Sequence, residues 1–257
     1  MAKVIAIANQ KGGVGKTTTS INLGACLAAA EKRTLVVDLD PQGNASVGLG
    51  LEKSIFSESN VYHAVIGEEN IQNCIYDTEL DCLKICPSDN NLIGAEVELI
   101  NVISRESKLK RALLNVDDEF DFIIIDCPPS MGILTLNAMV AVDTVLVPLQ
   151  CEYYALEGLS YLLSSIQKIK KNFNPKLDLL GVVLTMYDKR NTLSVQVADD
   201  VKKHLKNKVF KTVIPRNVKV SEAPSHGKPV LLYDIKCPGS QAYMNLVREI
   251  LNQGSKQ

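Results

Sequence analysis

Short apolar runs alternate along this chain with longer segments whose apolar residues recur at helical spacing. The runs predict strands over residues 4–8, 34–38, 83–86, 122–126, 144–148, 179–185 and 209–214. The segments between them predict helices, among them residues 17–30, 92–103, 156–171 and 193–205. Such alternation is typical of βαβ units, so we expect an α/β fold with three layers and a doubly wound, mostly parallel sheet. Residues 51–82 carry no pattern that we can assign.

The predicted helix over residues 193–205 has one apolar side. That side carries four residues at four-residue intervals: Leu193, Val197, Val201 and Leu205. We expect this stripe to face the core, which turns the lysines of the opposite side toward water. Those lysines are Lys202, Lys203 and Lys206.

Composition places the chain among globular proteins. With 257 residues, 46% of them hydrophobic, and a net charge of −1, a disordered chain or a coiled coil is excluded. Seven cysteines without a C-x-x-C pair indicate reduced thiols. The sequence shows neither a signal-peptide layout nor an apolar run of membrane-spanning length, so we expect a cytoplasmic protein with one domain over residues 1–257.

The charges balance over the whole chain but not along it. Residues 1–159 carry 11 basic and 22 acidic side chains, whereas residues 160–257 carry 17 basic and 7 acidic ones. Nine of the basic residues fall between Lys189 and Lys219. Such asymmetry indicates a polyanionic partner, although cations in the last turn of a helix also interact favourably with its dipole.

A glycine-rich loop follows the first predicted strand and leads directly into a helix. It reads KGGVGKTT over residues 11–18, and such a strand, loop and helix form a cradle for phosphates. Its members are Lys11, Gly12, Gly13, Val14, Gly15, Lys16, Thr17 and Thr18. Lys16 would supply a charge to the phosphates and the Thr17 hydroxyl could bind Mg²⁺. The loop departs from the usual G-x-x-x-x-G-K-[ST], because Gln10 replaces the first glycine and Lys11 adds a second cation.

Carboxylates end two other predicted strands. Asp126 closes an apolar strand in the manner of a Walker B residue, which helps to hold Mg²⁺, usually through water. Asp38 and Asp40 end the strand over residues 34–38 and the turn after it, two residues apart on one side of the pleat. Asp40 is suited to orient an attacking water, or simply to form the Asp-Pro turn.

These motifs together resemble the ParA-type partition ATPases, close to the Soj branch. The resemblance rests on KGGVGKTT (11–18), VDLDPQGN (37–44), IDCPPS (125–130), VIPRN (213–217) and SEAPSHGKP (221–229), and it spans nearly the whole chain. It implies a P-loop NTPase of the deviant Walker A (SIMIBI) type, with ATP and Mg²⁺ as cofactors. Because the first predicted strand starts at residue 4, we expect no N-terminal helix-turn-helix extension of the kind that some plasmid ParA proteins carry.

The resemblance further implies a working cycle. Two ATP-loaded subunits would pack face to face, with Lys11 crossing to the partner's phosphates and Asp40 positioning the water. The adenine-side loop would be Pro215, Arg216 and Asn217. The ATP dimer would bind double-stranded DNA without sequence preference through Arg190 and Lys219, which fall inside the basic cluster together with Lys202, Lys203 and Lys206. A ParB/Spo0J-type centromere-binding protein would stimulate a weak intrinsic ATPase on the bacterial nucleoid and so drive chromosome or plasmid segregation.

Three other functions are open to a chain with this loop. A MinD-like regulator acting at the membrane would need an amphipathic C-terminal helix, whereas residues 243–257 look like a packing helix with a short polar tail. An iron–sulfur reductase would use two cysteines, for which Cys127 and Cys151 are the candidates, but the glycine-flanked ligand context is missing. A metabolic ATP-dependent ligase would need a second substrate pocket.

Overall fold

The computed structural model describes residues 1–254, and its centre is one eight-stranded sheet within that range. The strands are β1 Lys3–Ile7, β2 Thr34–Asp38, β3 Tyr76–Asp77, β4 Leu83–Cys86, β5 Phe122–Asp126, β6 Thr144–Gln150, β7 Asp178–Tyr187 and β8 Val209–Pro215. They lie in the order β3-β4-β2-β5-β1-β6-β7-β8, and all neighbouring pairs are parallel except β3 with β4. The predicted fold class is confirmed, and all seven predicted strands are present.

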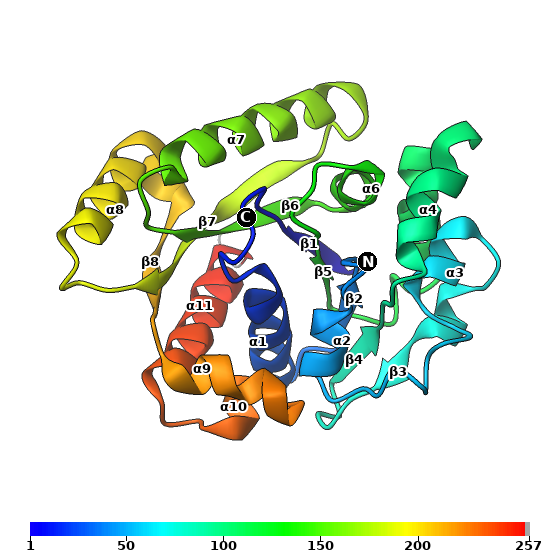
Figure 1. Cartoon of the computed structure of the whole chain (residues 1–257), viewed down its shortest axis with the longest axis horizontal. Helices are drawn as coiled ribbons and strands as arrows, with labels where there is room; N and C mark the ends of the chain where they lie inside the picture. The colour runs from blue at the N-terminus through cyan, green and yellow to red at the C-terminus, as the bar shows by residue number, and fades with distance from the viewer. Residues whose placement is uncertain (255–257) are drawn as a thin grey trace.

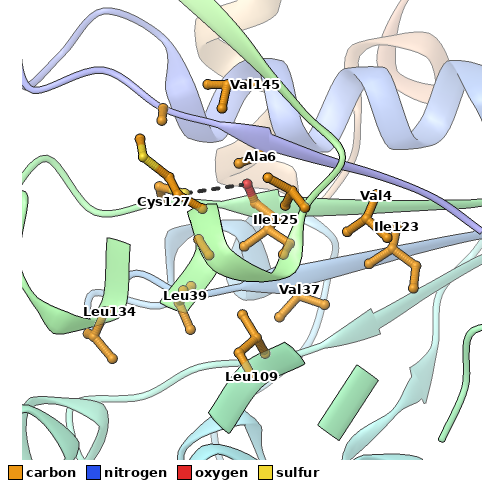
Figure 2. Packing of buried hydrophobic residues seen from close by; sticks show 14 of the residues in the cluster. Val4, Ala6, Val37, Leu39, Leu109, Ile123, Ile125, Cys127, Leu134 and Val145 are labelled. Carbon is orange, nitrogen blue, oxygen red and sulfur yellow. Dashed lines mark hydrogen bonds between the residues drawn. The ribbon is translucent and has the colours of Figure 1, made fainter. Parts of the chain in front are cut away.

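Both faces of the sheet are buried, because successive strand residues point to opposite sides. In β1, Val4 and Ala6 belong to one apolar cluster while Ile5 and Ile7 belong to the other. Figure 2 shows part of the first cluster, in which side chains of β1, β2 and β5 lie against Leu109 and Leu134 from the covering helices. The near-continuous apolar runs in the sequence follow from this two-sided burial.

Helices cover the two faces and complete three layers (Figure 1). One face carries α1 Lys16–Ala29, α2 Asn44–Gly48, α9 Val218–Glu222, α10 Val230–Tyr233 and α11 Pro238–Gly254. The other carries α3 Val61–Ile66, α4 Leu92–Glu98, α5 Lys108–Leu113, α6 Ile133–Ala141, α7 Ala155–Asn172 and α8 Thr192–Leu205. Short 3₁₀ turns, η1 Ile71–Cys74, η2 Leu99–Asn101, η3 Arg105–Ser107, η4 Lys206–Lys208 and η5 Ala223–His226, join several of them.

Two predictions about helices were wrong in part. The helix expected over residues 92–103 ends at Glu98 and continues only as the 3₁₀ turn η2, because the backbone leaves helical angles at Val102 (ψ 130°). In α8 the stripe at four-residue spacing rotates by about 40° per step around the helix. Leu193 is therefore 40% exposed, and the buried side consists of Ser194, Val197, Ala198 and Val201. Lys202, Lys203 and Lys206 are exposed as expected.

The previously unassigned residues 51–82 contain α3, η1 and the short antiparallel strand β3. The predicted C-terminal packing helix is α11, and the polar tail after it, residues 255–257, lies outside the described residues.

Candidate nucleotide site

A cavity of about 360 Å³ opens at the carboxyl edge of the sheet, where β1, β2 and β7 end. Open α/β sheets bind ligands at this edge. Its lining comprises Gly12, Gly13, Gly15, Lys16, Thr17, Thr18, Asp40, Asn44, Pro129, Thr185, Met186, Ile214, Pro215, Arg216, Asn217, Val220, Ser221 and Tyr243. The structure thus brings the glycine-rich loop, Asp40 and the predicted adenine-side segment over residues 215–217 into one cavity.

The glycine-rich loop is held in shape from both sides. Gly13 and Gly15 adopt left-handed backbone angles (φ 73° and 89°) that glycine tolerates without strain. The carbonyl of the buried Val14 accepts a hydrogen bond from Thr185 Oγ1 at 2.8 Å, which ties the loop to β7. The side-chain oxygen of Asn9 accepts a bond from Lys11 N at 3.0 Å. The loop is therefore preorganised, with its glycines lining the cavity.

The N-terminus of α1 points its amides at this cavity. Gly15 is the N-cap and offers no side-chain cap, and the first turn contains no acidic residue. Lys16, which begins the helix, is buried, and its Nζ donates to the carbonyl of Lys11 at 3.2 Å. Burial lowers the pKa of the Lys16 ammonium, whereas the charges of Asp126 and Asp40 raise it. The buried ammonium and the uncapped amides both attract negative charge, so together they form a binding site for an anion.

Asp126 lies behind the loop at the end of β5 and is fully buried. Its Oδ1 accepts from Ser20 Oγ at 2.8 Å, but its Oδ2 has no hydrogen-bond partner among residues 1–254. Burial, together with the charge of Asp38, raises the pKa of this carboxyl to about 8, and the hydroxyls of Thr17 and Ser20 oppose the rise. A buried carboxylate oxygen without a partner, close to the Thr17 hydroxyl, is a fitting hard-oxygen donor set for Mg²⁺.

Asp38 and Asp40 have different environments despite their spacing. Asp38 is fully buried, and its Oδ2 accepts from Ser46 N at 2.9 Å and from Ser46 Oγ at 2.8 Å. It therefore anchors α2 to the end of β2. Asp40 is half-buried in the cavity wall, and its Oδ1 accepts from Gln42 N at 3.0 Å. Of the two, Asp40 is the carboxylate placed to meet a ligand.

Lys11 does not share the environment of Lys16. It is absent from the residues that line the cavity, and its ammonium forms an ion pair with the Glu152 carboxylate. Both side chains are nearly half exposed, at 43% and 46%. Glu152 follows β6, so the pair joins two loops at the carboxyl edge. The second lysine of the loop therefore lies at the surface and outside its own cavity.

The predicted DNA-contact residues divide between the two ends of α8. Arg190 precedes this helix at the carboxyl edge, while Lys202, Lys203 and Lys206 lie toward its far end, about 15–21 Å along the axis from its first residue. Lys219, on α9, follows β8 and lies at the same edge as Arg190. Arg190 bonds to Asp188 through Nε and Nη2 at 3.0 and 2.9 Å, and Lys219 pairs with Glu222 at 3.0 Å. The basic cluster is thus not one compact patch.

Several lining residues were missed by sequence reasoning. Tyr243 reaches the cavity from α11, Asn44 from the start of α2, and Pro129 from the loop after β5. Met186 lines the wall with a left-handed backbone (φ 48°), which no pattern of residue types reveals. Asn44, Pro129 and Ser221 lie within the quoted motifs, so their presence at the cavity could have been predicted.

The candidate cluster cysteines, Cys127 and Cys151, are buried in the apolar core. Burial raises the pKa of both thiols, that of Cys151 to about 11. Within residues 1–254, no group of three or more His, Cys, Asp or Glu side chains is arranged to hold a metal ion. Over the same residues, no helix has both the length and the apolar character needed to cross a membrane.

Comparison with known proteins extends these observations. The AAA domain family, AAA_31, matches residues 2–179. The sporulation initiation inhibitor protein Soj of Bacillus subtilis is 54% identical over 99% of this chain and 100% of its own length. The chromosome partitioning protein ParA of Caulobacter vibrioides is 52% identical over 98% of this chain and 94% of its own.

The fold has a solved counterpart of similar extent. A structure named cobyrinic acid a,c-diamide synthase from Mycobacterium smegmatis, with bound ADP and magnesium, superposes with a TM-score of 0.87 at 37% identity, covering 99% of this chain and 96% of that one. With a family match over more than half of its length and relatives above 50% identity, the chain belongs to the ParA/Soj family of chromosome-partitioning ATPases, as its motifs predicted.

Proposed function

We propose that this chain hydrolyses ATP with Mg²⁺ in a sandwich of two copies, each of which completes the other's cavity with Lys11. The observation that carries this proposal is the different placement of the two loop lysines. Lys16 is buried at its own cavity, whereas Lys11 lies at the surface beyond the cavity wall. A cation in that position is available to a second copy and can stabilise charge on the transferred phosphoryl group there, as an arginine finger does.

The other site residues have separate roles within one cavity. The amides of residues 12–18 cradle the phosphates, and Lys16 binds the β- and γ-phosphates. Thr17 and Asp126 would hold Mg²⁺, Asp126 through water, and the ion would supply positive charge beside the phosphates. Asp40 orients the attacking water. The adenine side is formed by Pro215, Arg216 and Asn217, which lie in the same cavity.

Completion by a second copy has a kinetic consequence. Because a lone subunit lacks the Lys11 charge at its own phosphates, its intrinsic turnover is slow. Activity then depends on the concentration of subunits and on partners that favour the paired state. A ParB/Spo0J-type centromere-binding protein is the partner that we propose, in a chromosome or plasmid segregation cycle of the bacterial nucleoid.

The paired state would also bind double-stranded DNA without sequence preference. Arg190 and Lys219 lie at the same edge as the nucleotide cavity, so they are placed to respond to nucleotide and pairing. Lys202, Lys203 and Lys206 would form a second positive region toward the far end of α8. Contacts of this kind go to phosphates, so binding should weaken steeply with salt.

A membrane-bound, MinD-like role is not favoured by α11. Its apolar residues are buried in the core beneath the sheet and are therefore not available to insert into a membrane. They are Tyr243, Leu246, Val247 and Ile250. A ligase role, suggested by the name of the Mycobacterium smegmatis protein, would require a second substrate for turnover. If the purified chain releases phosphate from ATP without such a substrate, the result supports an ATPase and not a ligase.

The proposal is tested with Asp40→Ala. This variant should bind ATP and hydrolyse it at least about 100-fold more slowly, because the water loses its orienting carboxylate. It should accumulate as a dimer on DNA, measured by light scattering and by retention on a duplex surface. Glu31→Ala, which removes an exposed carboxylate after α1, is the matched control and should behave as the unchanged protein. Unchanged turnover in Asp40→Ala would refute the role given to this residue.

A further inference from the structure

The turn that carries Asp40 is closed at both ends by one buried carboxylate. At the start of the turn, Asp38 Oδ1 accepts a hydrogen bond from Asp40 N at 3.2 Å. At the other end, Asp38 Oδ2 accepts from Ser46 N at 2.9 Å and from Ser46 Oγ at 2.8 Å. Asp38 and Ser46 are both fully buried, so water does not compete for these bonds. The backbone between Asp40 and Ser46 is therefore held at its two ends.

The Ser46 hydroxyl also connects this turn to the loop after β4. Its oxygen accepts a hydrogen bond from Ser88 N at 3.0 Å, while its proton is donated to Asp38. A serine hydroxyl has a single proton, so the two partners together fix its orientation. Ser88 is fully buried as well. Loss of the hydroxyl would leave the Ser88 amide without this acceptor in a place that water does not reach, which is costly.

Ser88 contacts the same turn a second time, through its carbonyl. Gly43 adopts a left-handed backbone (φ 66°), and a Cβ at that position would lie 2.5 Å from the Ser88 carbonyl oxygen. Gly43 N in turn donates to the Asp40 carbonyl at 2.9 Å. The position of the Ser88 backbone therefore limits the position of Gly43 and, through it, that of Asp40. The hydrogen bond from Ser88 N to Ser46 thus holds the turn as well as the loop.

These bonds lie behind the nucleotide cavity and not in its wall. Asp40 and Asn44 line the cavity, whereas Ser46 and Ser88 are not among its lining residues. We propose that Ser46 is a positioning residue for hydrolysis: by linking Asp38 to Ser88, its hydroxyl holds the Asp40 carboxylate where it can orient the attacking water. This role rests on the proposed function of Asp40. It requires no contact between Ser46 and the nucleotide, because a small displacement of a reacting group is enough to slow a reaction.

The experiment measures kcat and KM for phosphate release from ATP. Ser46→Ala should lower kcat about tenfold and leave KM for ATP within about twofold, because the cavity wall that binds ATP is unchanged. Ser46→Thr, which retains the hydroxyl, should recover most of the lost rate. Thr34→Val is the matched control, since it removes a fully buried hydroxyl from the opposite end of β2, where Thr34 Oγ1 donates to the Lys32 carbonyl at 2.9 Å. It should reduce stability without changing kcat.

A second measurement separates a role through Asp40 from a general structural role. Ser46→Ala is combined with Asp40→Ala, and the rate of the double variant is compared with that of Asp40→Ala alone. If Ser46 acts by placing the Asp40 carboxylate, its loss has no further effect once that carboxylate is gone, so the two rates should agree within about twofold. If Ser46→Ala does not fold, as judged by circular dichroism, Ser46→Cys replaces it in both measurements, because a thiol keeps the volume but is a weak donor.

Three results would overturn the proposal. The first is a folded Ser46→Ala with unchanged kcat, and the second is an equal loss of rate in Ser46→Ala and Ser46→Thr. The third is a further tenfold loss when Ser46→Ala is added to Asp40→Ala, which would show that Ser46 acts independently of that carboxylate. The outcome for Asp40→Ala alone keeps the two proposals apart. Unchanged turnover in that variant refutes the proposed function, whereas a slow Asp40→Ala beside a fully active Ser46→Ala refutes only the role of Ser46.

Discussion

The ion pair between Lys11 and Glu152 gives a quantitative test of the paired state. If Lys11 serves the partner's phosphates, it must leave Glu152 when two copies meet. Glu152→Gln removes the charge that holds Lys11 in the single copy and leaves the size of the side chain almost unchanged. The variant should therefore form the ATP dimer more readily than the unchanged protein.

The size of this effect follows from the exposure of the pair. Both side chains are more than 40% exposed, so solvent screens their attraction and the pair contributes about 0.2–1 kcal/mol. A dimer breaks two such pairs, which amounts to about 0.4–2 kcal/mol. The dissociation constant of the ATP dimer should then fall by about 2- to 30-fold, since 1.4 kcal/mol corresponds to a factor of ten.

The assay is light scattering over a concentration series with a slowly hydrolysed ATP analogue. Glu157→Gln, on the exposed side of α7 a few residues away, removes an equal charge without touching Lys11 and should leave the dissociation constant unchanged. A weaker dimer in Glu152→Gln, or one of unchanged affinity, would refute the reasoning that Lys11 exchanges Glu152 for the partner.

Three further predictions concern the core, the buried carboxylates and the basic surface. Gly24→Ala should destabilise the protein by about 1–3 kcal/mol in chemical denaturation, because the new Cβ would lie 2.7 Å from Val36 Cγ2 where α1 packs on β2. Without Mg²⁺ or nucleotide, the free energy of unfolding should decrease as pH rises from about 4 to about 8. The reason is that the pKa values of Asp38 and Asp126 are raised in the folded state to about 6 and about 8, so these carboxyls ionise first in the unfolded chain. Asp126→Asn should flatten the upper part of this decrease, and an unchanged slope in that variant would contradict the reasoning. Arg190→Glu should lose retention on DNA at moderate salt while it still dimerises with ATP, and full retention would place the DNA contact elsewhere.

The sequence predicts the sheet well because each central strand is buried on both faces. The run over residues 122–125 is entirely apolar and ends in Asp126, so composition and length alone predict a strand there. The strand β3 is only two residues long and lies at the edge, where pairing with β4 rather than composition defines it. Local pattern carries little information about such an element.

In the candidate site too, features set by local sequence could be predicted, whereas features set by contacts between distant residues could not. The glycine-rich loop and Asp126 could be placed because strand, loop and helix follow one another in the sequence. The pairing of Lys11 with Glu152 joins residues 141 positions apart, and no spacing rule anticipates it. Likewise, the separate environments of Asp38 and Asp40 arise from Ser46, which folds back onto only one of them.

The most direct test of the paired site is complementation between two inactive variants. In a mixture of Lys11→Ala and Asp40→Ala, a mixed dimer has one cavity with its own Asp40 and a Lys11 from the partner, and one cavity with neither. If Lys11 acts across the interface, an equimolar mixture should regain about one quarter of the unchanged protein's rate, since half of randomly formed dimers are mixed and each has one complete cavity. A mixture of Lys11→Ala with the double variant Lys11→Ala/Asp40→Ala contains no Lys11 and should stay inactive. Absence of any regained activity in the first mixture, with mixed dimers demonstrated, would contradict the account, because it would mean that each Lys11 serves its own cavity.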